Sequence, residues 1–170
     1  MSAPKPAQRL RGAKSPVQRP KKGLQTASAG PLNTDYLETL LGYNARRAAL
    51  YVIGRSAQEM AQYDLRPVDF SVMSVVHHNP GVTSRQLCAS LDILPPNLVK
   101  IVQSLEAREW LVRLPHPHDG RAVGLHPTDK GIALMQEAEA RISALEKMVA
   151  NPLSPEQQEQ LISLLRKIYL

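Results

Sequence analysis

Proline and other turn-forming residues divide the middle of the chain into short segments, and this constrains the fold more than any other feature. Pro67 and Pro95 suit the first turn of a helix but not its interior. Asn79-Pro80-Gly81 is a strong turn signal, and the run 113–127 is bounded and interrupted by proline and glycine. The chain from 67 to 127 is therefore predicted to fold as several short elements.

Two of these segments predict a helix-turn-helix. Thr83 and Gln86 have the spacing of a capping box, which starts a short helix ending near Leu91. The next helix runs from Pro95 to Arg108. Its apolar residues recur on one face of the helix: Leu98, Ile101, Val102 and Leu105. Its polar residues remain for the other face: Asn97, Lys100, Gln103 and Ser104. Two short helices joined by a tight turn, the second with a polar face, are typical of a helix-turn-helix.

A polar loop follows this pair of helices. Asp119 and Arg121 flank Gly120 in a tip bounded by proline, with apolar Leu111 and Val112 before it and apolar residues at 122, 123 and 125 after it. Apolar runs separated by glycine and proline predict a β-hairpin. A helix-turn-helix followed directly by a β-hairpin is a winged helix.

Longer helical segments flank this region. Apolar residues recur at helical spacing from Asn33 to Asp64, with Asn33 or Thr34 as the N-cap. After the hairpin, Thr128 is expected to cap a helix that runs to about residue 150, and Ser154 followed by proline starts the last helix. The predicted order is four helices, a hairpin and two helices, which is a mainly α fold with a small β-hairpin wing.

Four motifs resemble the multiple antibiotic resistance regulator (MarR) family: LGYNARRA (41–48), NPGVTSRQLCASL (79–91), VKIVQSLEAREWLVR (99–113) and DGRAVGLHPTDKG (119–131). The last is the most specific, because it matches the family's Asp-x-Arg-Ala wing tip, a strand and then Thr-x-x-Gly opening the next helix. The resemblance covers nearly everything from Leu37 onward. It implies a homodimeric DNA-binding repressor, often released by a small molecule.

The same resemblance implies that the helix from Pro95 lies in the major groove of double-stranded DNA. There Asn and Gln suit adenine edges, Lys suits guanine or phosphate, and apolar atoms contact thymine methyl groups. Arg121 has the reach and permanent charge to enter a narrow minor groove, with Asp119 holding its guanidinium; a pair that only stabilises the hairpin is the alternative. A helix start can also bind a phosphate. The candidate DNA-binding residues are Thr83, Ser84, Arg85, Pro96, Asn97, Val99, Lys100, Gln103, Asp119 and Arg121.

The chain departs from the family just after this helix. The family usually has glycine where this chain has Glu109, and glycine there supports a left-handed cap. Glutamate in that conformation costs roughly 1 kcal/mol. We therefore expect the helix to end differently, without a positive φ at Glu109 and with Trp110 packed beneath the wing.

The terminal helices carry more apolar residues than one small core needs. Those of the last helix, such as Leu161 and Leu165, lack an obvious partner within one winged helix. Pairing two chains buries them and spaces two DNA-contacting helices about one DNA turn, roughly 34 Å, apart on a pseudo-palindromic site. The predicted organisation is a tail (1–31), a first dimerisation helix (32–66), a winged helix-turn-helix (67–127) and C-terminal dimerisation helices (128–170).

The family's small molecules bind between the dimerisation helices and the winged helix. Tyr43, Arg47 and Tyr51 share one face of the first helix at i, i+4 and i+8. An arginine between two phenols can hold the carboxylate of an aromatic acid of the hydroxybenzoate, hydroxycinnamate or hydroxynicotinate type; alternatively, Arg47 extends along the surface or pairs with an acid across the dimer. The candidate effector-binding residues are Tyr43, Arg46, Arg47, Tyr51 and His77 or His78.

Charge is concentrated at the N-terminus. Residues 1–31 hold seven basic and no acidic residues, whereas the rest of the chain holds 14 basic and 15 acidic residues. With five prolines and no aromatic residue, this tail is expected to be disordered, either as a solvated extension or as an arm that adds phosphate affinity. The chain has no apolar run long enough for a bilayer and no secretory signal, so we expect a cytoplasmic protein.

The residues also bear on functions other than DNA binding. Cys88 is the only cysteine, and a redox-sensing regulator would use it, although a buried thiol is usually inert. His116 and His118 fall short of the four ligands of a structural zinc site, so no metal and no cofactor are predicted. No phosphate loop, nucleophile elbow or recognisable carboxylate pair points to an enzyme. A winged helix that binds only proteins is the remaining alternative.

Overall fold

The computed structural model describes residues 31–116 and 119–170, and of residues 116 and 119–122 it describes the backbone alone. The predicted disorder of the basic tail falls on residues outside these ranges. Residues 36–170 form one compact unit. Within the described residues, no helix combines the length and the apolar composition that crossing a lipid bilayer requires.

The first predicted helix is broken in two, so the expectation of one continuous helix from Asn33 to Asp64 is wrong. Helix α1 (Asp35–Glu38) is capped by Asn33, whose Oδ1 accepts from the Asp35 N–H at 3.0 Å. Helix α2 (Leu41–Met60) follows and tightens into the 3-10 turn η1 (Ala61–Tyr63). The Asn44 side chain stabilises the break, because its Nδ2 donates to the carbonyl oxygens of both Glu38 and Leu40 at 2.8 Å.

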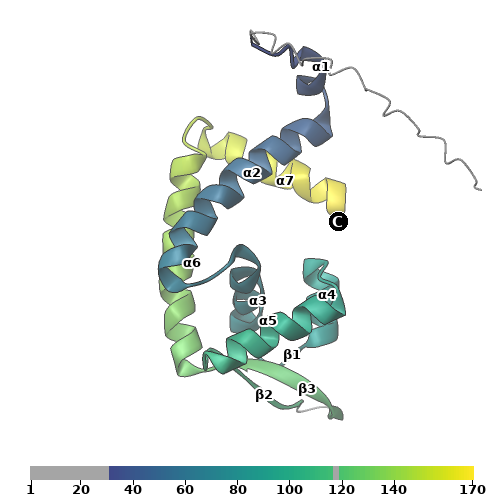
Figure 1. The fold of residues 1–170 in the computed structure, drawn as a ribbon, viewed down its shortest axis with the longest axis vertical. Helices are drawn as coiled ribbons and strands as arrows, with labels where there is room; N and C mark the ends of the chain where they lie inside the picture. Colours follow the sequence, from purple (N-terminus) through teal and green to yellow (C-terminus); the bar gives the residue numbers. More distant parts are fainter. Residues whose placement is uncertain (1–30, 117–118) are drawn as a thin grey trace, which may run out of the picture. The chain divides into compact units, whose positions relative to one another are not determined.

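The other helices begin where proline and capping residues predicted. Helix α3 (Pro67–His78) has proline in its first turn, and α4 (Ser84–Leu91) has the Thr83–Gln86 capping box. Helices α5 (Pro95–Ala107), α6 (Asp129–Val149) and α7 (Pro155–Tyr169) follow, with Thr128 and Ser154 capping the last two. The predicted mainly α fold with a β wing is confirmed (Figure 1).

A three-stranded antiparallel sheet in the order β1-β3-β2 forms the wing and its base. Strands β2 (Leu111–His116) and β3 (Asp119–Pro127) make the predicted hairpin, in which Leu114 lies opposite Gly124. Strand β1 (Val82–Thr83) was not predicted, because two residues carry no periodicity. It depends on a close backbone approach: a Cβ on Gly124 would lie 2.8 Å from the carbonyl oxygen of Gly81.

The core lies around α3. Val72, Met73 and Val76 of α3 are fully buried, and residues from all the surrounding elements pack into the same cluster, including Met60, Leu87, Leu98, Leu105, Leu111, Leu125 and Met135. Two polar contacts join α2 and η1 to α6: Glu59 of α2 pairs with Arg141 at 2.6 Å, and the Tyr63 hydroxyl of η1 donates to Glu137 at 2.9 Å. The core therefore holds α4, α5 and the wing in a fixed arrangement.

Candidate nucleic-acid interface

Helix α5 presents one face to the core and the other to solvent. Leu98, Ile101, Val102 and Leu105 are buried, as the spacing predicted. On the opposite side, Pro96, Asn97, Lys100 and Gln103 are exposed, and Val99 keeps 49% of its surface. The candidate residues of this helix thus share its exposed side, and α5 lies beside the wing (Figure 1). Their contacts with DNA stay a prediction.

The start of α4 supplies a second exposed group. Ser84 and Arg85 are exposed in its first turn. The Thr83 hydroxyl already donates to Gln86 Oε1 at 2.8 Å and accepts from the Gln86 N–H at 3.4 Å, so it acts as a helix cap. Ser84 and Arg85 are therefore better placed than Thr83 to contact a phosphate group.

The wing extends from the end of α5. In its register, His116 lies opposite Asp119, and the two connecting residues fall outside the described ranges. The side chains of Asp119 and Arg121 also lie outside the described part, so their predicted pairing remains a prediction. At the other end of the wing, Arg113 Nε donates to Glu106 Oε1 at 2.8 Å, which ties β2 to α5.

The end of α5 corrects the prediction for Glu109. Its φ is 61°, so the left-handed cap of the family is kept although the residue is glutamate. The Trp110 N–H donates to the Leu105 carbonyl at 3.1 Å and the Glu109 N–H to that of Glu106 at 2.9 Å, which is a Schellman motif. These two bonds, and the burial of Trp110 in the core, offset the strain.

Arg108 connects this end of α5 to the end of η1. Its guanidinium donates to the Asp64 carboxylate and to the Asp64 carbonyl, both at 2.5 Å, and lies 4.7 Å from the centre of the Trp110 ring. Asp64 itself is in the left-handed conformation, with φ of 54°. Arg108 therefore fixes α5 relative to the end of the N-terminal helix.

Arg66 is a site residue that the sequence pattern did not indicate. Its guanidinium pairs with both carboxylate oxygens of the buried Asp69, at 2.6 and 2.7 Å, and this hydrogen bonding raises the pKa of Arg66 above its ordinary value. Arg66 also lines a hollow beside α5 together with Asn97 and Lys100. The sequence did carry a signal: Arg66 stands just before the helix-starting Pro67, and Asp69 follows three residues after Arg66. It was overlooked because arginine is not a usual N-cap residue.

The residues predicted to bind an effector fall into two sets. Tyr43, Arg46, Arg47 and Tyr51 lie along α2, where Tyr43 is half-buried and the other three are exposed. The guanidinium over the Tyr51 ring belongs to Arg55, at 5.6 Å, which the sequence pattern did not indicate. His77 and His78, at the end of α3, lie instead beside Glu139 of α6.

These two sets are separated along the fold. On α6, Glu139 contacts His78, and Arg141 two residues further along contacts Glu59 of α2. Tyr51 lies eight residues before Glu59, which is about 12 Å of helix.

Cys88 is half-buried in α4 against the core, so the structure adds no support to the redox-sensing alternative.

The helix-turn-helix, the exposed face of α5 and the adjacent wing define a winged-helix DNA-binding protein. The family model described as MarR family matches residues 63–122. The chain is also 32% identical to the transcriptional repressor CouR bound to a 23-mer DNA duplex, with a TM-score of 0.78 over 83% of this chain and 100% of that one. The chain belongs to the MarR family of transcriptional regulators.

A second structure of CouR and one further relative agree with this assignment. CouR bound to p-coumaroyl-CoA matches with 32% identity and a TM-score of 0.72, over 81% of this chain and 97% of that chain. A putative transcriptional regulatory protein for the hcr operon of Thauera aromatica is 26% identical over 147 residues, which cover 82% of this chain and 89% of the relative.

Proposed function

We propose that this chain is a homodimeric transcriptional repressor that binds a pseudo-palindromic site on double-stranded DNA and is released by an aromatic acid. In this proposal α5 lies in the major groove, and Arg121 enters the adjacent minor groove beside Asp119. The observation that carries the proposal is the exposed row of Asn97, Lys100 and Gln103 on a helix whose other face is buried. The CouR structure on a DNA duplex supports it.

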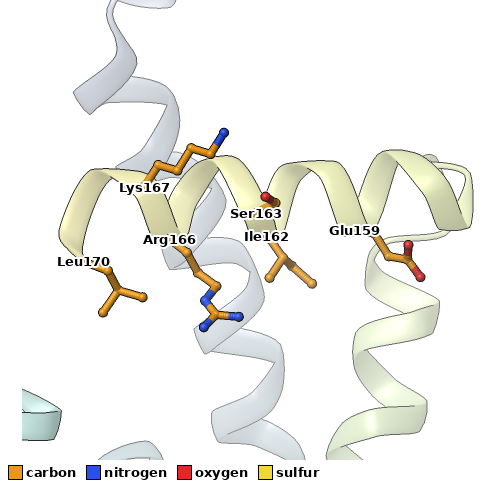
Figure 2. Close-up of a pocket in the computed structure, with 6 residues that line it drawn as sticks. All are labelled: Glu159, Ile162, Ser163, Arg166, Lys167 and Leu170. Atoms are coloured by element: carbon orange, nitrogen blue, oxygen red, sulfur yellow. The ribbon is translucent and has the colours of Figure 1, made fainter.

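The homodimer rests on apolar surface that one chain leaves uncovered. Helix α7 has no buried residue, and its apolar side chains are 39–62% exposed: Leu161, Ile162, Leu164, Leu165 and Ile168. Leu41, Leu50 and Ile53 of α2 are also more than half exposed. A groove of about 540 Å³ is lined only by residues of α7 and by Leu170, which follows it, as Figure 2 shows, so the groove has one wall. In this proposal a second copy supplies the missing wall and covers the exposed apolar side chains of α2 and α7, which are more numerous than isolated surface residues of a monomer.

DNA binding is tested on the segment just upstream of the encoding gene. We expect the full chain to shift this duplex with a dissociation constant of about 10⁻⁸ M or tighter at physiological salt. Arg121→Ala should weaken binding strongly without altering the circular dichroism spectrum, whereas Arg46→Ala, outside the proposed interface, should leave binding unchanged. Equal affinity of the Arg121 variant at moderate salt would remove the proposed role of the wing.

The effector class is tested separately. CouR binds p-coumaroyl-CoA, so the screen should compare free aromatic carboxylates with their coenzyme A thioesters. A ligand that binds the folded protein raises its melting temperature by mass action, and the same ligand should release the DNA. A screen in which no aromatic acid or thioester stabilises the protein would count against this part alone, because DNA binding is measured independently.

A further inference from the structure

Two imidazoles and a carboxylate meet between α3 and α6. His77 and His78 end α3, and Glu139 lies in the middle of α6, 61 residues further along the chain than His78. One ligand atom from each of the three residues lies within 4.8 Å of the others. The His78 Nε2 atom is 3.1 Å from each of the two carboxylate oxygens of Glu139. The cluster therefore joins a helix of the winged helix-turn-helix to the long helix that leads to α7.

An ion pair between His78 and Glu139 leaves two features of this cluster unexplained. The His77 Nδ1 atom is buried and has no hydrogen-bond partner among the described residues. A buried polar atom without a partner costs free energy, and a bound metal ion is one partner that removes this cost. The second feature is that Ser74 Oγ donates to Glu139 Oε1 at 2.8 Å, which fixes the carboxylate. Hydrogen bonds of this kind orient the ligands of metal ions.

The donor set selects the class of ion. Imidazole nitrogen suits Zn²⁺, Co²⁺, Ni²⁺ and Cu²⁺, whereas Mg²⁺ and Ca²⁺ prefer oxygen ligands alone. Two nitrogens and a carboxylate form a three-ligand set of the kind that leaves a fourth position open to water. The side chain of His78 is 61% exposed and that of Glu139 26% exposed, so an ion has access from solvent.

The spacing requires only a small adjustment. Zinc–nitrogen bonds of about 2.0–2.1 Å in a tetrahedral site put ligand atoms roughly 3.4 Å apart. The atoms here lie within 4.8 Å of one another, so closure needs shifts of about 1 Å, which rotation of the exposed His78 ring can provide. We propose that His77, His78 and Glu139 bind one divalent transition-metal ion of the Zn²⁺ class, with Ser74 orienting the carboxylate.

The test is calorimetric titration of the metal-free full chain with Zn²⁺, with Mg²⁺ as the comparison ion. We expect one Zn²⁺ per chain and no heat from Mg²⁺. His78→Ala and Glu139→Gln should each weaken Zn²⁺ binding by at least about 10-fold, and Ser74→Ala by roughly 10-fold. The matched control is the double variant His116→Ala, His118→Ala, which removes two imidazoles from the wing and should bind Zn²⁺ as the parent chain does.

A second readout separates a site from weak surface binding. Zn²⁺ bound here ties α3 to α6, so it should raise the melting temperature of the parent chain and of the wing control but not of the His78 or Glu139 variants. Binding at or below the level of Mg²⁺, full affinity in His78→Ala and Glu139→Gln, or loss of binding in the wing control would each overturn the proposal. His77→Ala is a further variant, but the test does not depend on it, because His77 is partly buried.

Discussion

At the scale of single residues, Glu109 has a backbone conformation that costs free energy in any residue with a Cβ. Its side chain returns little, because the contact of Glu109 with Lys130 is 3.4 Å long and both side chains are mostly exposed. Glu109→Gly should therefore raise the free energy of unfolding by about 1 kcal/mol, measured by urea denaturation. Glu146→Gly, an exposed glutamate inside α6, should lower it by a similar amount. A loss of stability in Glu109→Gly would show that the left-handed cap is not strained.

Gly131 is constrained in a different way, by a close approach of backbone. A Cβ at this position would lie 1.9 Å from the Trp110 carbonyl oxygen, which accepts a hydrogen bond from the Thr128 N–H at 3.1 Å. Gly131→Ala therefore pushes the first turn of α6 away from the end of α5. We expect it to lower the free energy of unfolding by about 1–3 kcal/mol or more.

The matched control for Gly131 is Gly42→Ala. A Cβ on Gly42 meets nothing within 4 Å, so the alanine should be neutral or stabilise α2 by up to about 1 kcal/mol. The same urea denaturation measures both variants. Equal stability of the two alanine variants would contradict the role given to the contact between Gly131 and Trp110.

At the scale of the elements, local chemistry determined most of what could be predicted. Proline and capping residues act within one helical turn, so α3 to α7 begin where Pro67, Thr83, Pro95, Thr128 and Ser154 indicate. Features that depend on distant backbone were missed. Strand β1 exists because Gly81 approaches Gly124, and the cap at Glu109 is held by bonds to Leu105 and Glu106 and by the burial of Trp110.

In the candidate sites, too, features set by local sequence could be predicted and features set by distant contacts could not. The two faces of α5 could be predicted because helical spacing alone separates Lys100 from Ile101. The grouping of His77 with Glu139 could not, since it depends on how α3 packs against α6, and no pattern within either helix indicates it.

Helix α7 provides a prediction for the dimer. Leu165 is 39% exposed on a helix without buried residues, and Leu165→Glu places a charge in the proposed interface twice, once per chain. Losing about 1.5–3 kcal/mol per leucine should raise the dimer dissociation constant by roughly 10²–10⁴-fold. Sedimentation equilibrium measures this change. Gln160→Glu adds the same charge at an exposed polar position of α7 and should leave the dimer intact; an unchanged dimer in both variants would place the interface elsewhere.

At the scale of the whole molecule, affinity for DNA must come from where the charges lie rather than from their sum. Outside the basic tail the chain has 14 basic and 15 acidic residues, so a uniform attraction to phosphate is absent from the folded body. Several acidic residues, including Glu137, Glu139 and Glu159, lie on α6 and α7, away from α5 in the sequence. Exposed cations such as Arg85 and Lys100 are therefore expected to dominate the interaction locally.

Salt dependence separates the two kinds of contact on α5. If Lys100 neutralises a phosphate, Lys100→Ala should lower affinity for every duplex and reduce the slope of log affinity against log salt by about one per chain. Gln103→Ala, on the same exposed face, should keep the slope and instead lose about 1–3 kcal/mol of discrimination at one base pair. Titrations of the operator and of a scrambled duplex at several salt concentrations measure both quantities. A fall in slope for Gln103→Ala together with an unchanged slope for Lys100→Ala would reverse the two roles, because only a released counterion changes the slope.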